Sequence, residues 1–155
     1  MGGVKIGLGA DHAGYRHKER IKAELLRLGH EVRDFGADNE QPSDYPDYAL
    51  PLARAVAGGD IDRAIWVCGT GLGGTLTAGG VAGVRAACCS EATTARYSRS
   101  HNDANFLALG QRIIGEEVAL DIVRTWLQTE FSGEERHRRR LDKVARISGV
   151  GPECA

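Results

Sequence analysis

One cysteine at the start of a glycine-rich loop is the residue of this chain best suited to chemistry. From Trp66 the chain reads WVCGTGLGG, an apolar run that ends at Cys68 and is followed by four glycines among six residues. Glycine lets the backbone adopt positive φ and approach a ligand closely, and consecutive free N–H groups form a concavity that suits an anion. At the carboxyl end of a parallel strand, such a loop stands where an open α/β sheet binds its ligand. The alternative is a tight turn next to a small buried residue, because free cysteines are often buried and inert.

Two more polar residues, Asp11 and His12, follow a short apolar run near the N-terminus. If this run and the one before Cys68 are parallel strands, the loops after them gather at the carboxyl edge of the sheet, where open α/β sheets bind their ligands. We therefore expect Asp11 and His12 to lie near Cys68. The alternative for Asp11 is an N-cap of the helix that follows it.

His101 and Asn102 come before an apolar run rather than after one. Chain order therefore places them at the opposite edge of the sheet in their own subunit, unless the preceding helix overshoots or they serve a neighbouring subunit. The alternative for His101 is a surface residue that closes a helix, where the helix dipole favours an imidazolium.

The C-terminal part of the chain carries a cationic run, RHRRR, from Arg136 to Arg140. Arg136 and Arg140 are four residues apart and share one helical face, which suits a grip on a phosphate or carboxylate. The alternatives are a solvated face or a nucleic-acid contact, and the latter lacks interleaved aromatic residues. Tyr45 lies in the polar run SDYPDY, where it either anchors the loop or stacks on a ligand.

These residues are connected by strands that alternate with helices. The patterns predict strands at 4–9, 31–35, 64–67, 84–89 and 105–109, and helices at 16–28, 47–57, 74–78, 92–100, 116–131 and 134–147. We expect an α/β fold: a three-layer α/β/α sandwich with a mainly parallel five-stranded sheet, Rossmann-like, as one domain over 1–148 with a loose tail at 149–155. The long polar segment 36–46 is typical of a binding loop.

Composition argues against several classes of function. The chain has 155 residues and a formal net charge of −1, which favours neither nucleic acid nor a membrane surface. No apolar run is long enough to span a bilayer, and the N-terminus has no leader pattern. Cys88 and Cys89 would point to opposite faces of a strand, and no cysteine has metal-ligand spacing. We therefore expect a cytoplasmic protein with reduced thiols, no metal and no cofactor.

Several segments together resemble the type B ribose-5-phosphate isomerases, to which the galactose-6-phosphate and allose-6-phosphate isomerases are related. In family order over nearly the whole chain, they are GADHAG at 9–14, DYP at 44–46, CGTGLG at 68–73, GVRA at 83–86, SHNDAN at 100–105 and LGQRIIG at 109–115. The resemblance implies a metal-free enzyme that interconverts an aldose phosphate and a ketose phosphate, most simply ribose 5-phosphate and ribulose 5-phosphate, through a cis-enediol.

The resemblance also implies a role for each matching residue. Cys68 would be the base that moves a proton between C2 and C1, and His101 the acid that opens the furanose ring, with Asp11 and Thr70 handling hydroxyls. The loop amides would hold the enediolate oxygen. The expected substrate contacts are Asp11, His12, Tyr45, Gly69, Thr70, Gly71, Leu72, Gly73, Asn102, Arg112, Arg136 and Arg140. His12, Arg136 and Arg140 match the positions that bind phosphate.

The family builds its site between two subunits, so the resemblance implies a homodimer, or a dimer of dimers, in which His101 serves the partner's cleft. One departure affects the substrate. Gly79 and Gly80 stand where the family has an amide and a cation, which leaves a four-carbon, six-carbon or deoxy sugar phosphate open. Two other functions stay as alternatives: a phosphosugar-binding module without activity, and nucleic-acid binding through the cationic run.

Overall fold

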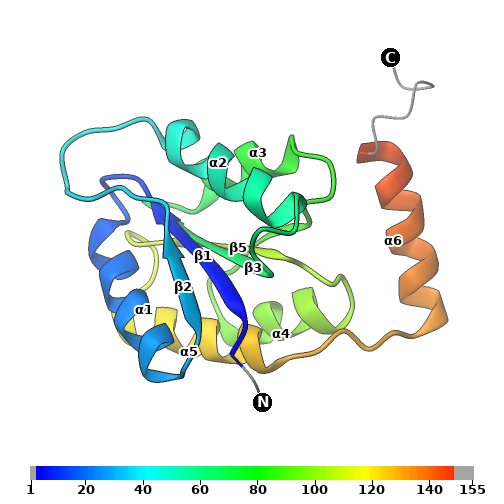
Figure 1. Cartoon of the computed structure of the whole chain (residues 1–155). Helices are drawn as coiled ribbons and strands as arrows, with labels where there is room; N and C mark the ends of the chain where they lie inside the picture. The colour runs from blue at the N-terminus through cyan, green and yellow to red at the C-terminus, as the bar shows by residue number, and fades with distance from the viewer. Residues whose placement is uncertain (1–2, 149–155) are drawn as a thin grey trace.

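The protein is a five-stranded sheet covered by helices on both faces, seen in a computed structural model that describes residues 3–148 (Figure 1). The strands are β1 (Lys5–Ala10), β2 (Glu31–Asp34), β3 (Arg63–Cys68), β4 (Ala86–Cys88) and β5 (Phe106–Gly110). The helices are α1 (Tyr15–Arg27), α2 (Tyr45–Ala57), α3 (Leu72–Gly79), α4 (Ala92–Ser100), α5 (Glu116–Gln128) and α6 (Glu135–Ser148). The predicted three-layer α/β/α architecture is confirmed; the tail predicted at 149–155 lies outside the described residues.

Every strand pair is parallel, in the order β2-β1-β3-β5-β4. The sheet is therefore wholly rather than mainly parallel. β5 is buried along its whole length, as its apolar sequence predicts, whereas β2 lies at the edge and is partly exposed.

Alternation along the strands divides the core into two layers. Ile65 and Val67 of β3 pack with α1 and α5 on one face, while Trp66 and Cys68 pack with α2 and α3 on the other. Cys89 lies in the first layer and Cys88 packs against the second, so the prediction that they face opposite sides is confirmed. The cysteine of the glycine loop thus faces the α2–α3 layer.

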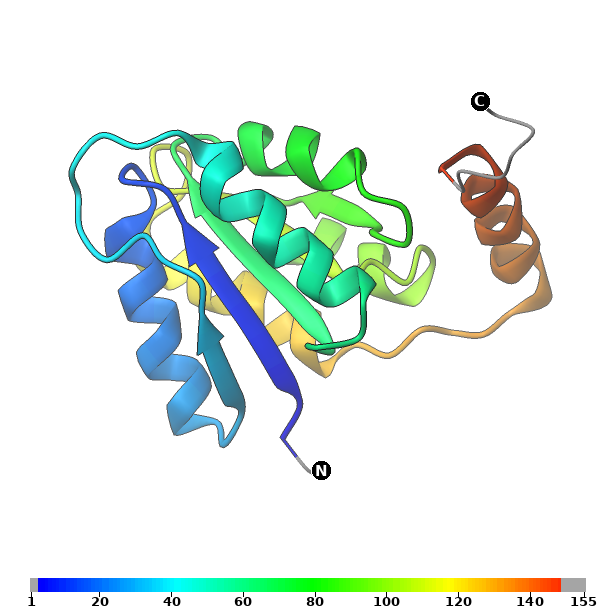
Figure 2. The same cartoon turned by 45° about the horizontal axis from the view of Figure 1, so that its top comes forward.

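The sheet positions its loops through the pairing of β1, β3 and β5. Ala10 pairs with Val67, and Cys68 pairs with Gly110, so the carboxyl ends of these three strands lie side by side. The chain leaves β1 for α1 on one face and leaves β3 for α3 on the opposite face (Figure 2). A crevice opens where the connections diverge in this way, and it is the usual ligand site of an open parallel sheet.

Some helix boundaries and faces differ from the sequence prediction. α3 begins at Leu72 rather than 74, and α5 ends at Gln128 rather than 131. The spacing in the sequence predicts a buried stripe of Val118, Ile122 and Trp126 in α5, but Val118 is 44% exposed. Ala119 and Val123 pack inward with the other two. A spacing of four residues identifies one helical face without identifying which residue at its border is covered.

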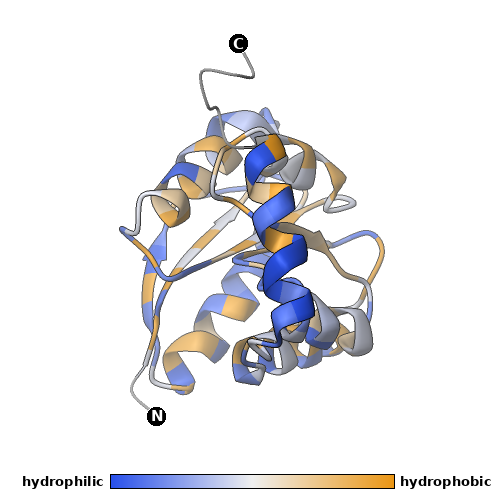
Figure 3. Cartoon of the chain, turned by 90° about the vertical axis from the view of Figure 1, so that its right-hand side faces the viewer, coloured by the Kyte–Doolittle hydropathy of each residue, from blue (hydrophilic) through white to orange (hydrophobic). Residues whose placement is uncertain are grey.

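Most of α6 projects away from the sheet and its covering helices, at the end of an extended segment that follows α5 (Figures 1 and 2), while its first turn stays in contact with the body through His137, which is buried. Most of its residues are hydrophilic, with a few hydrophobic ones among them (Figure 3), and Ile147 is 81% exposed. Within residues 3–148, no helix combines the length and the apolar character that crossing a membrane requires.

Candidate active site

A hollow of about 240 Å³ lies at the carboxyl ends of β1 and β3. It is lined by Asp11, His12, Ala13, Tyr45, Cys68, Gly69, Thr70, Gly73 and Arg112. All of these except Ala13 are residues that the sequence analysis singled out. They come together because the strands that carry their loops are neighbours in the sheet.

Cys68 is the last residue of β3, and its sulfur faces the glycine loop. The Gly71 amide donates a hydrogen bond to Cys68 Sγ at 3.2 Å, and Gly71 is the N-cap of α3. A backbone donor and the start of a helix both stabilise a thiolate. The side chain is only 4% exposed, so reagents reach it through the hollow.

The glycines of the loop are required by close contacts as well as by conformation. Gly71 has φ of 81°, and a Cβ there would lie 2.8 Å from Cys88 Sγ. A Cβ at Gly73 would lie 2.8 Å from the Tyr45 ring. Tyr45, the first residue of α2, therefore packs over the glycine loop and forms a wall of the hollow; that it stacks on a ligand stays a prediction.

Asp11 turns its own loop rather than capping α1. Its Oδ1 accepts a hydrogen bond from the Ala13 amide at 2.9 Å. The N-cap of α1 is Gly14, so no side chain caps this helix. The N-cap alternative for Asp11 is therefore wrong: the chain makes one extra turn before the helix begins. The carboxylate is 6% exposed and lines the hollow beside Cys68.

The turn after β5 fixes the outer side of the glycine loop. The amide of Gln111 donates to the Cys68 carbonyl at 2.8 Å, and the amide of Arg112 donates to the Gly69 carbonyl at 3.0 Å. These bonds continue the β3–β5 pairing past the ends of the strands. They bring the guanidinium of Arg112 against Gly69, where it supplies a positive charge to the hollow.

Four of the expected site residues do not line this hollow: His101, Asn102, Arg136 and Arg140. His101 is the C-cap of α4 and precedes β5, whose first residue pairs with Ala64. Cys68 lies at the other end of the same ladder, beside Gly110, and the rise of a strand makes that separation about 13 Å. Gly71 and Leu72 also lie outside the lining, although their loop forms it.

His101 instead stacks on the first turn of α6. Its ring lies 4.4 Å from that of His137, nearly parallel at 14°, and 4.8 Å from the Tyr97 ring. Burial lowers the pKa of His137, and the neighbouring His101 ring lowers it further. Nε2 of His137 is buried with no hydrogen-bond partner among the described residues. Sequence reasoning missed His137, because it lies within the cationic run and has no distinctive spacing.

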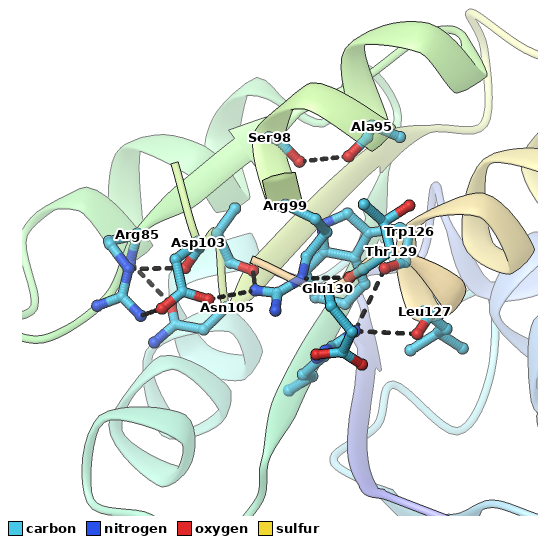
Figure 4. A network of polar contacts seen from close by, with 12 residues as sticks. Arg85, Ala95, Ser98, Arg99, Asp103, Asn105, Trp126, Leu127, Thr129 and Glu130 are labelled. Carbon is cyan, nitrogen blue, oxygen red and sulfur yellow. Dashed lines mark hydrogen bonds and ion pairs between the residues drawn. The ribbon is translucent and has the colours of Figure 1, made fainter. Parts of the chain in front are cut away.

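A network of arginines holds the turn after His101 (Figure 4). Asp103 has φ of 45° and lies between two guanidiniums: Arg99 donates to its Oδ1 at 2.9 Å, and Arg85 pairs with its Oδ2 at 3.3 Å. Arg85 also donates to its carbonyl at 2.7 Å. Asp103 thus fixes the backbone that presents His101 and Asn102. The sequence analysis quoted Asp103 only as part of a motif and gave it no role.

The candidate site has no preformed metal cage. No three His, Cys, Asp or Glu side chains within residues 3–148 converge in a way that could hold a metal ion. What the hollow offers is a sulfur on a backbone amide, a carboxylate, a hydroxyl and a guanidinium. These are groups for moving protons on a small polar, anionic substrate.

The comparisons with known proteins agree with this chemistry. The family described as Ribose/Galactose Isomerase matches residues 6–144. Ribose-5-phosphate isomerase B of Escherichia coli is 45% identical over 143 residues, which cover 92% of this chain and 95% of that protein. D-erythrulose-4-phosphate isomerase of Pectobacterium atrosepticum is 41% identical over 132 residues, or 84% and 86% of the two chains.

Solved structures extend the likeness to the whole fold. Ribose-5-phosphate isomerase B of Clostridium thermocellum superposes with a TM-score of 0.90 at 51% identity and covers 92% of this chain and 96% of its own. The enzyme of Mycoplasma genitalium, solved with bound ribulose 5-phosphate, has a TM-score of 0.91 at 34% identity and covers 97% and 100%.

Proposed function

Because this chain belongs to the ribose/galactose isomerase family and is an aldose–ketose isomerase of sugar phosphates, we propose that it interconverts ribose 5-phosphate and ribulose 5-phosphate. The family inferred from the sequence motifs is confirmed. The observation that carries the finer proposal is Cys68 at the end of β3, with its sulfur on the Gly71 amide and Asp11, Thr70 and Arg112 around it.

In the proposed mechanism Cys68 is the base. Its thiolate removes the proton from C2 of the opened aldose to give an enediolate, whose oxygen the loop amides from Gly69 to Gly73 hold; a proton passes from O2 to O1, and the thiol returns its proton to C1. Loss of one such donor typically costs about 2.7–4 kcal/mol of barrier. Asp11 and Thr70 would position the sugar hydroxyls, since both line the hollow beside the sulfur.

We also propose that a second copy of the chain completes the site. His101 would protonate the ring oxygen, and Asn102, Arg136 and Arg140 would bind the substrate, from the partner of the protomer that supplies Cys68. Two observations support this: these residues lie outside the hollow of their own chain, and α6 beyond its first turn projects away from the body. The proposed unit is a homodimer of single-domain protomers over 1–148.

A second substrate has specific support. A relative of 41% identity is a D-erythrulose-4-phosphate isomerase. In this chain α3 ends at Gly79 and its C-cap is Gly80, so neither position has a side chain that could contact a longer sugar. The same thiol chemistry applies to a four-carbon chain, because the proton still moves between C1 and C2. A cytoplasmic location and a reaction without metal or cofactor stay predictions.

The test is an activity screen of the chelator-treated enzyme over four-, five- and six-carbon aldose and ketose phosphates. We expect the highest kcat/KM for the ribose 5-phosphate pair, and Cys68→Ala to lower kcat at least about 100-fold while substrate still binds. A preference for erythrulose 4-phosphate would select the second substrate. A near-normal kcat for Cys68→Ala would disprove the assignment of the base.

A further inference from the structure

The ring of His12 is held on one side by the loop between β2 and α2. The Ser43 amide lies 3.1 Å from His12 Nδ1, and the His12 amide donates to Ser43 Oγ at 3.2 Å. The backbone amide of each residue thus donates to the side chain of the other, across 31 positions of sequence. Both contacts lie beside the hollow that contains Cys68, which His12 lines.

The loop that carries Ser43 is itself anchored at its base. The Ala10 amide donates to the Gly36 carbonyl, and the Ala37 amide donates to the Ala10 carbonyl, both at 2.7 Å. The Gly36 amide donates to Asp34 Oδ1 at 2.9 Å, and the fully buried ammonium of Lys18 pairs with the same carboxylate. The loop is therefore tied to the end of β1, immediately before Asp11 and His12.

The direction of the Ser43 contact determines which ring nitrogen carries the proton. A backbone amide only donates, so Nδ1 must present its lone pair, and the single proton of a neutral imidazole is then on Nε2. Among residues 3–148, no hydrogen bond to His12 Nε2 is formed. We propose that Ser43 is a positioning residue that holds His12 as the neutral Nε2–H tautomer, with that N–H offered to a substrate oxygen.

This inference rests on the proposed function for its ligand and assigns His12 a particular part in binding it. A neutral ring contributes a directed hydrogen bond but no charge. The charge of a sugar phosphate would then be balanced by guanidiniums, such as that of Arg112 on the same hollow. A proton on Nδ1 would face the Ser43 N–H, so the observed contact fits the tautomer that carries its proton on Nε2.

The direct test is nitrogen NMR of the ligand-free, ¹⁵N-labelled enzyme at neutral pH, with the His12 signals assigned by their loss in His12→Gln. We expect Nδ1 to resonate as an unprotonated nitrogen and Nε2 as a protonated one. A protonated Nδ1, or an average of the two tautomers, would overturn the proposal. Because no substrate is present, this result is independent of whether the enzyme isomerises ribose 5-phosphate.

Two variants of Ser43 test the cause. Ser43→Ala keeps the backbone N–H and should leave the His12 nitrogen signals unchanged. Ser43→Pro removes that N–H and should let the tautomers average, provided that circular dichroism shows the wild-type fold. If Ser43→Pro is folded and retains the wild-type tautomer, Ser43 is not the positioning group. If it does not fold, the wild-type spectrum still decides the tautomer.

Kinetics of two His12 variants test the donor. Gln places an amide N–H close to the Nε2 position, whereas Asn places an oxygen close to Nδ1 and reaches no further. We expect KM to rise more than about 10-fold in His12→Asn and only a few-fold in His12→Gln, with kcat less affected. Equal behaviour of the two variants would contradict the donor role. Inhibition by inorganic phosphate identifies the oxygen: it weakens in His12→Asn if the phosphate is bound and is unchanged if a sugar hydroxyl is.

Discussion

At the scale of single residues, the position of the Cys68 sulfur depends on the backbone of one glycine. Gly71 donates to that sulfur from a left-handed conformation that alanine adopts only with strain. The amide and the thiol are consequently a unit. Under the proposed mechanism, the role of Cys68 as the base would depend on the shape of the loop as much as on the side chain itself.

Gly71→Ala should therefore damage both stability and turnover. The positive φ costs roughly 1–2 kcal/mol in the free energy of unfolding, and the new Cβ lies against Cys88 Sγ, so the loop must shift and kcat should fall by roughly 100-fold. Urea unfolding and steady-state kinetics measure the two effects.

A matched control exists at Gly59, which has the same φ of 81° but where a Cβ would meet nothing within 4 Å. Gly59→Ala should lose similar stability and keep its kcat. If both variants kept full activity, the amide of Gly71 would have no part in the reaction.

At the scale of elements, the turn between α4 and β5 is set by one carboxylate between two arginines. Asp103→Ala loses both the tolerance of a left-handed backbone and the charge; Asp103→Gly loses only the charge; Asp103→Asn keeps the conformation and part of the hydrogen bonding. We expect the free energy of unfolding to fall by about 1–3 kcal/mol in Asp103→Ala, and progressively less in the Gly and Asn variants. Urea titrations measure this order, and wild-type stability of Asp103→Gly would show that the carboxylate is not needed.

α1 and α5 are joined by a carboxylate whose ionisation should show in acid. Hydrogen bonds from Arg27 and Arg124 lower the pKa of Glu24 from 4.5 to about 2. Because the pKa is lower in the folded state, the stabilisation is complete above about pH 4.5 and is lost as the pH falls towards 2. The gap in unfolding free energy between the wild type and Glu24→Gln should therefore be largest at neutral pH and shrink in acid.

Denaturant titrations over this pH range test that expectation. Glu117→Gln is the control, because Glu117 is 80% exposed and lies 3.9 Å from its partner Arg20, and exposed pairs contribute little. A gap between the wild type and Glu24→Gln that does not change with pH would contradict the role of Glu24.

The sequence predicted the elements well where periodicity was strong and less well at their borders. All five strands and the helices between them were anticipated, because apolar runs and glycine breaks delimit each one. The start of α3 was missed because glycines give no helical signal. Val118 was wrongly assigned to the buried face because residue spacing identifies a helical face but not which residues at its border are covered. Burial depends on the neighbouring element, which a local pattern does not contain.

Part of the candidate site followed from the same reasoning. Asp11, His12 and Cys68 were grouped because parallel strands bring their carboxyl ends together. The Ser43–His12 contact and the arginines around Asp103 were not foreseen, since they join loops that are far apart in sequence and leave no periodic trace. A role for His101 came only from family resemblance, because chain order places it at the other edge of the sheet.

At the scale of the whole molecule, the proposed shared site can be tested by mixing subunits. Cys68→Ala and His101→Ala should each be inactive, but their heterodimer would contain one intact site. After unfolding and refolding together, about one quarter of wild-type specific activity should return if subunits pair at random. Steady-state assays of the mixture against each parent measure this.

The control mixes Cys68→Ala with Arg112→Ala. Both residues line the hollow of one chain, so every heterodimer site has a defect and activity should not return. If the first mixture regains no activity while the wild type refolds in parallel, the shared site is contradicted. Cys68 and His101 would then act within one protomer, or one of them would take no part in the reaction.

The separate position of α6 has a further consequence under the proposed assembly. If Arg136, Arg140 and His101 of each site come from the partner subunit, only associated subunits are active. Turnover per subunit would then decline on extreme dilution and recover when the protein is concentrated again. The concentration of the enzyme in a cell would then determine the fraction of subunits with a complete active site, as well as the total number of subunits.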